Sequence, residues 1–172
     1  MKLIACVDKN WAIGSNGNLL FKLPEDMRFF KQITTDCGIV IMGRKTFESL
    51  KSEDGLKGRE NWVLTRDKDY QKKYPNIKVF HSKDDIFRSP DYDRNKICII
   101  GGTQIYKQFL SACDEAYITL VSDSGKDPDT FFPKNLDNSK SWELEYSYQG
   151  SECVRIGINY KFNKYRNILL EV

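Results

Sequence analysis

The sequence is poor in the residues that metal sites and disulfide frameworks require. Among its 172 residues there is one histidine, His81, and the five cysteines include no Cys-x-x-Cys pair. We therefore expect no metal site, and the odd, widely spaced cysteines predict reduced thiols that pack as small hydrophobic side chains. A Ser-His-Asp triad would need His81, but Ser82 followed by Asp85 is typical of a helix N-cap instead.

Long hydrophobic runs and a strong excess of one charge are also missing. No segment has the length of a membrane span, no secretory signal is visible at the N-terminus, and the formal net charge is only +3. A small excess of positive charge gives no argument for a nucleic-acid or membrane surface, although it permits a local patch for an anionic ligand. We expect a cytoplasmic monomer that binds neither nucleic acid nor membrane.

Short apolar segments alternating with amphipathic ones dominate the first two thirds of the chain. The length suits one domain with a sizeable core. The segments predicted as strands are residues 3–7, 39–42, 61–65, 77–80, 97–100 and 116–121. The segments predicted as helices are residues 25–34, 44–50, 84–88 and 103–110, and residues 10–23 are predicted as a loop rich in Gly and Asn. Continuous apolar strands followed by helices indicate a parallel sheet buried on both faces.

The last third has a different pattern. Apolar residues alternate with polar ones from Trp142 to Tyr148 and again from Val154 to Phe162, around a turn predicted at residues 149–152. This alternation is typical of an antiparallel hairpin. Together the patterns predict an α/β fold: a three-layer αβα sandwich with a central, mostly parallel mixed sheet of about eight strands and a C-terminal antiparallel hairpin.

Polar residues follow three of the predicted strands at their carboxyl ends, where ligands bind in open α/β sheets. They are Gly43-Arg44-Lys45-Thr46, Thr65-Arg66 and Gly101-Gly102-Thr103-Gln104. Free N–H groups, hydroxyls and cations at one sheet edge suit a ligand with several phosphates. Each segment also has an ordinary interpretation, as a turn or as solvated surface. Gly-x-Gly-x-x-Gly is absent, so the usual dinucleotide fingerprint is not the mode of binding.

Two charged residues have a possible role in binding or catalysis. Asp26 shares a helix face with Phe30 and Ile33, which predicts a carboxylate on the apolar side; an acid that only satisfies the helix dipole is an equal alternative. Arg59 precedes a strand, where it would serve either as a bidentate clamp for a carboxylate or as a solvated loop charge.

The ordered motifs resemble those of the dihydrofolate reductase family across residues 1–162. The matching segments are residues 3–5, 12–14, 23–27, 40–50, 58–61, 99–102, 105–106 and 129–133. The resemblance implies NADPH-dependent reduction of 7,8-dihydrofolate to 5,6,7,8-tetrahydrofolate, by hydride transfer to C6 and protonation at N5. It also implies a place in one-carbon metabolism, supporting thymidylate, purine and amino-acid synthesis, in a family that is an antifolate target.

The resemblance assigns residues to this reaction. The catalytic positions are Phe21, Asp26 and Thr119. Asp26 would hold the pterin and assist protonation, and Thr119 would support that carboxylate. Arg59 would clamp the glutamate of the substrate. The substrate positions are Ile4, Ala5, Cys6, Asp26, Met27, Phe30, Leu50, Leu56, Arg59, Ile100 and Thr119. The cofactor positions are Cys6, Ile13, Gly14, Asn18, Leu19, Gly43, Arg44, Lys45, Thr46, Leu64, Thr65, Arg66, Ile100, Gly101, Gly102, Thr103, Gln104, Ile105, Tyr106 and Thr130. A cis peptide between Gly101 and Gly102 and a mobile lid at residues 14–20 are implied as well.

The sequence departs from the family pattern at three places. Leu20-Phe21 stands where Pro-Trp is usual, and Phe21 has no indole N–H to hold a water. Thr103 replaces a common third glycine. Residues 1–162 are expected to form the dihydrofolate reductase-like domain, and residues 163–172 a C-terminal extension of the same domain. There are two alternatives to dihydrofolate reduction. The first is the related reductase of riboflavin synthesis, which the presence of Asp26 and Arg59 disfavours. The second is a folate- or nucleotide-binding protein with little turnover, which the presence of Phe21 leaves open.

Overall fold

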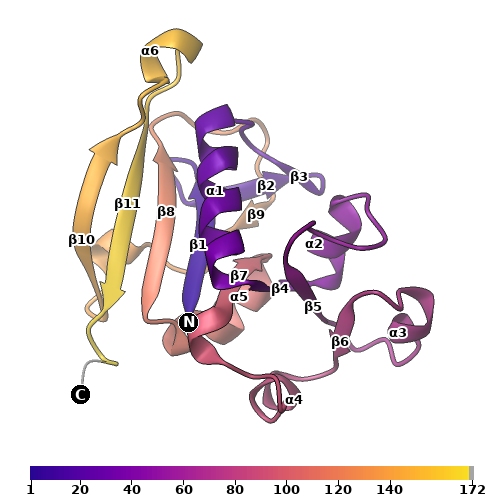
Figure 1. Cartoon of the computed structure of the whole chain (residues 1–172). Coiled ribbons are helices and arrows are strands. Elements are labelled where there is room, and N and C mark those ends of the chain that lie inside the picture. Colours follow the sequence, from indigo (N-terminus) through magenta and orange to yellow (C-terminus); the bar gives the residue numbers. More distant parts are fainter. Residues whose placement is uncertain (171–172) are drawn as a thin grey trace.

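The apolar segments predicted as strands form the centre of an eight-stranded mixed sheet (Figure 1). The structure is a computed structural model and describes residues 1–170. The strands of this sheet are β1 (Lys2–Val7), β4 (Ile39–Gly43), β5 (Glu60–Leu64), β6 (Lys78–Phe80), β7 (Ile97–Gly101), β8 (Glu115–Val121), β10 (Trp142–Gln149) and β11 (Tyr160–Asn167). Their order is β10-β11-β8-β1-β7-β4-β5-β6. The strands from β8 to β6 pair in parallel, and β11 pairs antiparallel with both β8 and β10.

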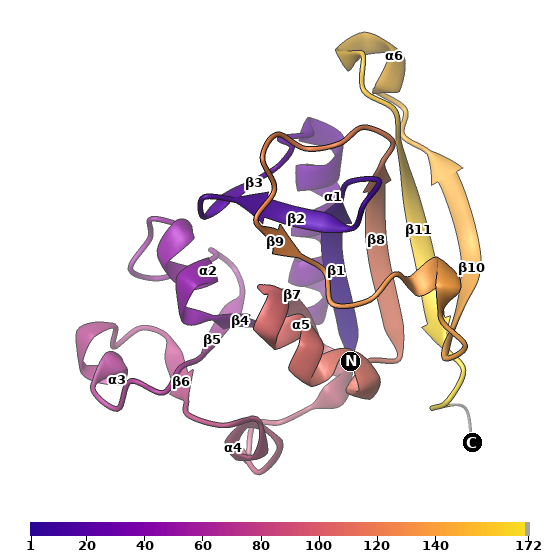
Figure 2. The same cartoon turned by 180° about the vertical axis from the view of Figure 1, so that it is seen from behind.

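Helices cover both faces of the sheet, which confirms the predicted three layers. One face carries α1 (Pro24–Cys37), α2 (Arg44–Ser49) and α3 (Tyr70–Lys73), and the other carries α4 (Lys83–Phe87) and α5 (Thr103–Phe109). Figure 1 is seen from the side of α1, and Figure 2 from the side of α5. Short 3-10 helices occupy Arg94–Lys96, Leu110–Ala112 and Leu136–Asn138.

The central strands are apolar throughout because both of their faces are buried. Ile4 and Val40 pack beneath α1, whereas Leu3 and Ile41 belong to the cluster on the α5 side. Each of these four side chains is at most 3% exposed. Burial of apolar side chains on both faces stabilises the sheet by roughly 1.5–3 kcal/mol for each large side chain. The same burial fixes the orientation of each strand and therefore the direction in which its carboxyl end points.

Helix α1 is three residues longer at its C-terminus than predicted. It starts with Pro24 at its first position, as expected of a residue whose missing N–H is not needed there. It ends at Gly38, whose φ of 96° suits glycine and whose N–H donates to the carbonyl of Thr34. This boundary places Glu25 and Asp26 in the first turn, at the carboxyl ends of the strands.

The predicted loop at residues 10–23 contains two strands of a second sheet, so its description as an irregular loop was wrong. β2 (Ala12–Ser15) pairs with β3 (Asn18–Leu19) and with β9 (Thr130–Phe131). The hairpin turns at Asn16 and Gly17, where φ is 50° and 76°. Asn-Gly is a favoured pair for such a turn, so the sequence does contain its signal.

The C-terminal hairpin exists, but its connection was predicted wrongly. Residues 154–158 do not continue a strand; α6 (Cys153–Ile156) forms a helical turn that ends at Gly157, whose φ is 71°. Strand β11 then runs to Asn167 in register with β8 and β10. Residues 163–167 therefore belong to the same sheet as the rest of the chain, and residues 171–172 of the expected extension lie outside the described residues.

Four smaller expectations concern the cysteines, the helix cap at Ser82, metal binding and membrane spans. All five cysteines are free and four of them are buried, as predicted. Ser82 caps α4, its hydroxyl accepting from the N–H of Asp85 at 3.1 Å. Within residues 1–170, no cluster of three His, Cys, Asp or Glu side chains is arranged to hold a metal. In the same part of the chain, the helices are too short or too polar to span a membrane.

Candidate active site

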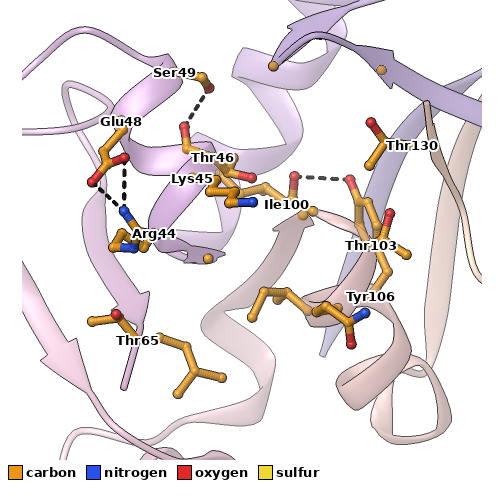
Figure 3. Close-up of a pocket in the computed structure, with 18 of the residues that line it drawn as sticks. Arg44, Lys45, Thr46, Glu48, Ser49, Thr65, Ile100, Thr103, Tyr106 and Thr130 are labelled. Atoms are coloured by element: carbon orange, nitrogen blue, oxygen red, sulfur yellow. Dashed lines mark hydrogen bonds and ion pairs between the residues drawn. The ribbon is translucent and has the colours of Figure 1, made fainter. Parts of the chain in front are cut away.

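A cavity of about 1860 Å³ runs along the carboxyl ends of the central strands (Figure 3). It lies between α2, the start of α5, and the small sheet of β2, β3 and β9. Every residue predicted to bind the cofactor lines this cavity, from Cys6 on β1 to Thr130 on β9. The sheet topology thus brings together segments that are more than a hundred residues apart in the sequence.

The walls of this cavity are rich in cations and hydroxyls. Arg44, Lys45 and Thr46 follow β4, and Thr65 and Arg66 follow β5. The guanidinium of Arg44 is paired with the Glu48 carboxylate at 3.1 Å, as Figure 3 shows. These groups are suited to bind phosphates, because charge-assisted hydrogen bonds to phosphate are among the stronger polar contacts in proteins.

The Gly101-Gly102 segment narrows the cavity at the end of β7. The peptide bond between the two residues is cis, as the resemblance implied. Gly101 has a φ of 118°, and a Cβ at this position would lie 3.1 Å from the Tyr106 ring. The Tyr106 hydroxyl donates to the carbonyls of Ile4 and Ile100 at 2.8 and 2.9 Å. Only glycine fits here, so the backbone itself forms this part of the wall.

Asp26 lies at the end of α1 nearest to this cavity, over the sheet. The hydroxyl of Thr119 on β8 donates to Oδ1 of Asp26 at 2.5 Å. Burial raises the pKa of Asp26 above the usual carboxyl range, and hydrogen bonds from Thr119 and Cys6 only partly offset this effect. Of the two roles considered for Asp26, the structure supports the carboxylate on the apolar side, where it is half-buried.

Most of the apolar residues predicted to bind the substrate lie in one cluster. Ile4, Phe30, Leu50, Leu56 and Ile100 belong to one apolar cluster beneath α1 and α2. Ala5 points to the opposite face of the sheet, into the α5 cluster, because successive residues of a strand alternate between faces.

Two further side chains of α1 differ in their exposure. Met27 is 55% exposed. Phe29, which was not predicted as a site residue, packs against Tyr117 and Phe162 with ring centroids 6.0 and 5.0 Å away. Its position on the inner face of α1 could have been predicted from the helical spacing of apolar residues in the sequence.

Arg59 is held in place by groups on two elements. Its Nε and Nη2 donate to the carbonyl of Lys57 at 3.0 and 2.8 Å, and its Nη1 donates to the Thr34 hydroxyl of α1 at 3.0 Å. Burial lowers the pKa of the guanidinium from its ordinary value. The solvated loop charge considered from the sequence is therefore not what is observed, since Arg59 is an ordered, half-buried cation beside α1.

Leu20 and Phe21 follow the small sheet. Phe21 packs against the cluster of Leu23, Val121 and Tyr160, near Cys6. Leu20 lies against Gly125, where a Cβ would come within 2.7 Å of its side chain. The segment at residues 14–20 is tied to residues 127–129 by three hydrogen bonds. The Ser15 hydroxyl donates to the Asp127 carbonyl at 2.7 Å, the Asn16 N–H donates to the Asp129 carboxylate at 2.8 Å, and the Asp129 N–H donates to the Gly14 carbonyl at 3.0 Å.

Several residues of the cavity were not identified from the sequence. They are Gly17, Glu48, Ser49, Asp67, Tyr70, Lys73, His81, Ser82, Lys83, Gln108, Asp129 and Phe131. His81 Nδ1 lies 2.8 Å from the carbonyl of Thr65. This contact joins the residue after β6 to the residue after β5. Most of these residues come one to four positions after a strand or within the first turns of a helix, so wider windows at the strand ends would have included many of them.

Comparisons with known proteins agree on one family. The family model described as dihydrofolate reductase matches residues 1–167. Dihydrofolate reductases of Staphylococcus aureus and Haemophilus influenzae are 31% and 37% identical over 150 and 144 residues, which cover 87% and 84% of both chains. The structure is similar to a dihydrofolate reductase from Enterococcus faecalis complexed with NADP(H) and RAB-propyl, with a TM-score of 0.83 and 29% identity over 97% of this chain and 95% of that one.

Proposed function

The chain belongs to the dihydrofolate reductase family, and we propose how its residues carry out the NADPH-dependent reduction of dihydrofolate to tetrahydrofolate. It is an NADPH-dependent oxidoreductase. The observation that carries the mechanism is the Asp26–Thr119 pair, a half-buried carboxylate that accepts a 2.5 Å hydrogen bond, close to a cavity whose walls contain cations and hydroxyls. The related reductase of riboflavin synthesis is not supported by the family match.

The cavity fits NADPH in both size and chemistry. Its 1860 Å³ volume is larger than that of most small-molecule pockets. Arg44, Lys45 and Thr46 would hold the phosphates, and Thr65 and Arg66 would lie near the adenosine ribose. Gly101 and Gly102 line the cavity without side chains, so the cofactor could approach the backbone closely there. Bound there, NADPH supplies the hydride that is transferred to C6 of the substrate.

Asp26 would hold the pterin ring through its 2-amino group and N3. Thr119 would keep the carboxylate oriented by donating to one of its oxygens, leaving the other for the substrate. The raised pKa of Asp26, caused mainly by burial, makes a proton available closer to neutral pH than an ordinary carboxyl group would. Asp26 would thereby assist protonation at N5. Phe21 packs in the apolar cluster near Cys6, and its side chain has no hydrogen-bond donor that could hold a water molecule.

The remaining substrate contacts follow from the apolar cluster and its single cation. Ile4, Phe30, Leu50, Leu56 and Ile100 would exclude water from the pterin and benzoyl groups. Arg59 would bind the glutamate carboxylate through guanidinium N–H groups that do not donate to Lys57 or Thr34. Downstream use of the product in thymidylate, purine and amino-acid synthesis, a monomeric state and a cytoplasmic location stay predictions.

The proposal is tested by supplying NADPH with deuterium at the transferable position of its nicotinamide. The purified protein is expected to oxidise it only when dihydrofolate is present, and to yield tetrahydrofolate with deuterium at C6, measured by mass spectrometry and NMR. A folded sample that binds both ligands without oxidation would support the alternative of a binding protein. Product without deuterium at C6 would contradict direct hydride transfer.

A further inference from the structure

Glu48 is an acid in a cavity wall that is otherwise suited to phosphates. It belongs to α2, lines the cavity together with Arg44 and Lys45, and has no part in the mechanism proposed for the reaction. A carboxylate repels a phosphate, so an acid at this place needs a role other than contact with the cofactor. Both of its carboxylate oxygens accept from Nη1 of Arg44, at 3.1 and 3.3 Å, as the dashed lines in Figure 3 show. The partner of Glu48 is therefore a cation of the cofactor wall.

The pair of Arg44 and Glu48 uses only one nitrogen of the guanidinium. Within residues 1–170, Nε and Nη2 of Arg44 have no hydrogen-bond partner, so their N–H groups remain available to a phosphate. The other cations that follow β4 and β5 are Lys45 and Arg66, and neither forms an ion pair in the same part of the chain. Arg44 is thus the cation of this group that is already held before a ligand binds.

A tyrosine of α3 contacts the same carboxylate. The hydroxyl of Tyr70 lies 3.3 Å from Oε1 of Glu48, and it is the donor because an ionised carboxylate can only accept. This distance is long for an O–H···O bond, so Tyr70 is a weaker partner of Glu48 than Arg44 is. Burial, followed by the negative charge of Glu48, raises the pKa of Tyr70, which keeps the phenol protonated and able to donate.

The ring of Tyr70 is fixed by packing between α2 and α3. It is 2% exposed and lies edge-on to Phe47 of α2 and tilted against Tyr74, with ring centroids 6.2 and 4.9 Å away. Phe47 is also buried and packs edge-on to Tyr74 at 5.0 Å. A packed tyrosine has few side-chain torsions left to fix. Tyr70 therefore offers Glu48 a rigid partner from outside α2.

We propose that Glu48 and Tyr70 are positioning residues for Arg44, whose guanidinium they hold in the orientation that binds a phosphate of NADPH. This rests on the proposed function, in which Arg44 contacts the cofactor. Neither residue would bond to the cofactor. Because the side chains of Arg44 and Glu48 are 43% and 39% exposed, their ion pair contributes little to the stability of the fold. Its value lies in binding, since a side chain that is already ordered need not be immobilised by the ligand.

The test is the dissociation constant of NADPH for the whole protein, measured by NADPH fluorescence in a double-mutant cycle. Glu48→Ala should weaken NADPH binding by roughly twofold to tenfold, which corresponds to the cost of immobilising one long side chain. In the Arg44→Ala background the same change should cause no weakening, because no guanidinium is left to hold and an acid leaves the phosphate site. Equal effects in the two backgrounds, or tighter binding by Glu48→Ala alone, would overturn the proposal.

Tyr70→Phe keeps the ring and removes the hydroxyl. It should weaken NADPH binding by a smaller factor than Glu48→Ala does, and it should add nothing once Glu48→Ala is present. An unchanged dissociation constant in Tyr70→Phe would overturn the role of Tyr70. Asp69→Asn is the matched control, because it removes an exposed carboxylate next to Tyr70 that pairs with Lys72 at 2.8 Å. If Glu48→Ala does not fold, Glu48→Gln takes its place in the cycle, with the same direction expected.

Two further measurements separate positioning from a defect of the fold and from failure of the proposed function. Glu48→Ala should raise the KM for NADPH while the affinity for dihydrofolate stays as in wild type, whereas a disturbed fold would weaken both. NADPH binding requires no turnover, so the cycle still decides this proposal if wild type binds NADPH without reducing dihydrofolate. A wild-type protein that does not bind NADPH would overturn both the cofactor site and the positioning of Arg44.

Discussion

At the scale of the residue, Asp26 shows how surroundings decide between two roles for an acid at the start of a helix. An acid that only balances the helix dipole has its charged form favoured. Asp26 instead accepts a hydrogen bond from Thr119 on the sheet, and burial raises its pKa. The spacing of Asp26, Phe30 and Ile33 predicted the apolar face correctly. The partner Thr119 lies 93 residues away and came only from the family resemblance.

The raised pKa of Asp26 predicts that this residue lowers the stability of the unliganded protein at neutral pH. The folded protein binds the carboxyl proton more tightly than the unfolded chain does. The contribution of Asp26 to stability is therefore full below the unfolded pKa and is lost as the pH rises through the folded pKa. Asp26→Asn should melt at a higher temperature than wild type at neutral pH, and the difference should shrink on mild acidification. A lower melting temperature for Asp26→Asn at neutral pH would contradict this.

Arg59 leads to a prediction about binding rather than chemistry. Its guanidinium is positioned by Lys57 and Thr34 and is far along α1 from Asp26. Arg59→Ala should raise the KM for dihydrofolate by roughly 10-fold to 100-fold, with a smaller change in kcat. Arg59→Lys should recover part of the affinity, because a lysine retains the charge without the bidentate geometry. Steady-state kinetics would measure this, with the exposed Arg88→Ala as control; an unaltered KM would remove the clamp.

At the scale of the element, short segments were harder to predict than long ones. Val154, Ile156 and Ile158 alternate in the sequence like a strand, yet they lie in and after α6, where Val154 is 98% exposed. A single helical turn contains too few residues to establish a helical period. Glu25 accepts hydrogen bonds from Ser151, the Glu152 N–H and the Tyr160 hydroxyl, which ties α1 to this connection.

This contact between α1 and the β10–β11 connection predicts a pH-dependent stability of opposite sign to that of Asp26. Burial alone would raise the pKa of Glu25, but the hydrogen bonds from Tyr160, Ser151 and Glu152 outweigh it and lower the pKa. The contribution of Glu25 is therefore present above the unfolded pKa and is lost as the pH falls through the folded pKa.

Glu25→Gln should consequently lower the melting temperature at neutral pH, with a smaller difference from wild type in acid. Glu53→Gln, which changes an exposed carboxylate, serves as the control in the same thermal melts. If Glu25→Gln and Glu53→Gln melt alike at neutral pH, the contact does not stabilise the connection.

At the scale of the whole molecule, the central sheet could be predicted because each buried strand has an apolar run and a glycine or turn after it. Ile39–Gly43 and Ile97–Gly101 are examples, and their carboxyl ends also contain the cofactor motifs. The second sheet could not be predicted as readily, since β3 and β9 have two residues each and β9 pairs with β2 across more than a hundred positions. The continuation of β11 to Asn167 depends on pairing with β8, which no local pattern reveals.

The most direct measurement is the rate of NADPH oxidation by dihydrofolate in a single turnover, compared between wild type and Asp26→Asn across a range of pH. The wild-type protein should reduce dihydrofolate, with a rate that falls as the pH rises through the midpoint of Asp26. Asp26→Asn should still bind NADPH, but its rate at neutral pH should be lower by roughly 100-fold or more. An Asp26→Asn protein that reduces dihydrofolate at the wild-type rate at neutral pH would contradict the role of the buried carboxylate.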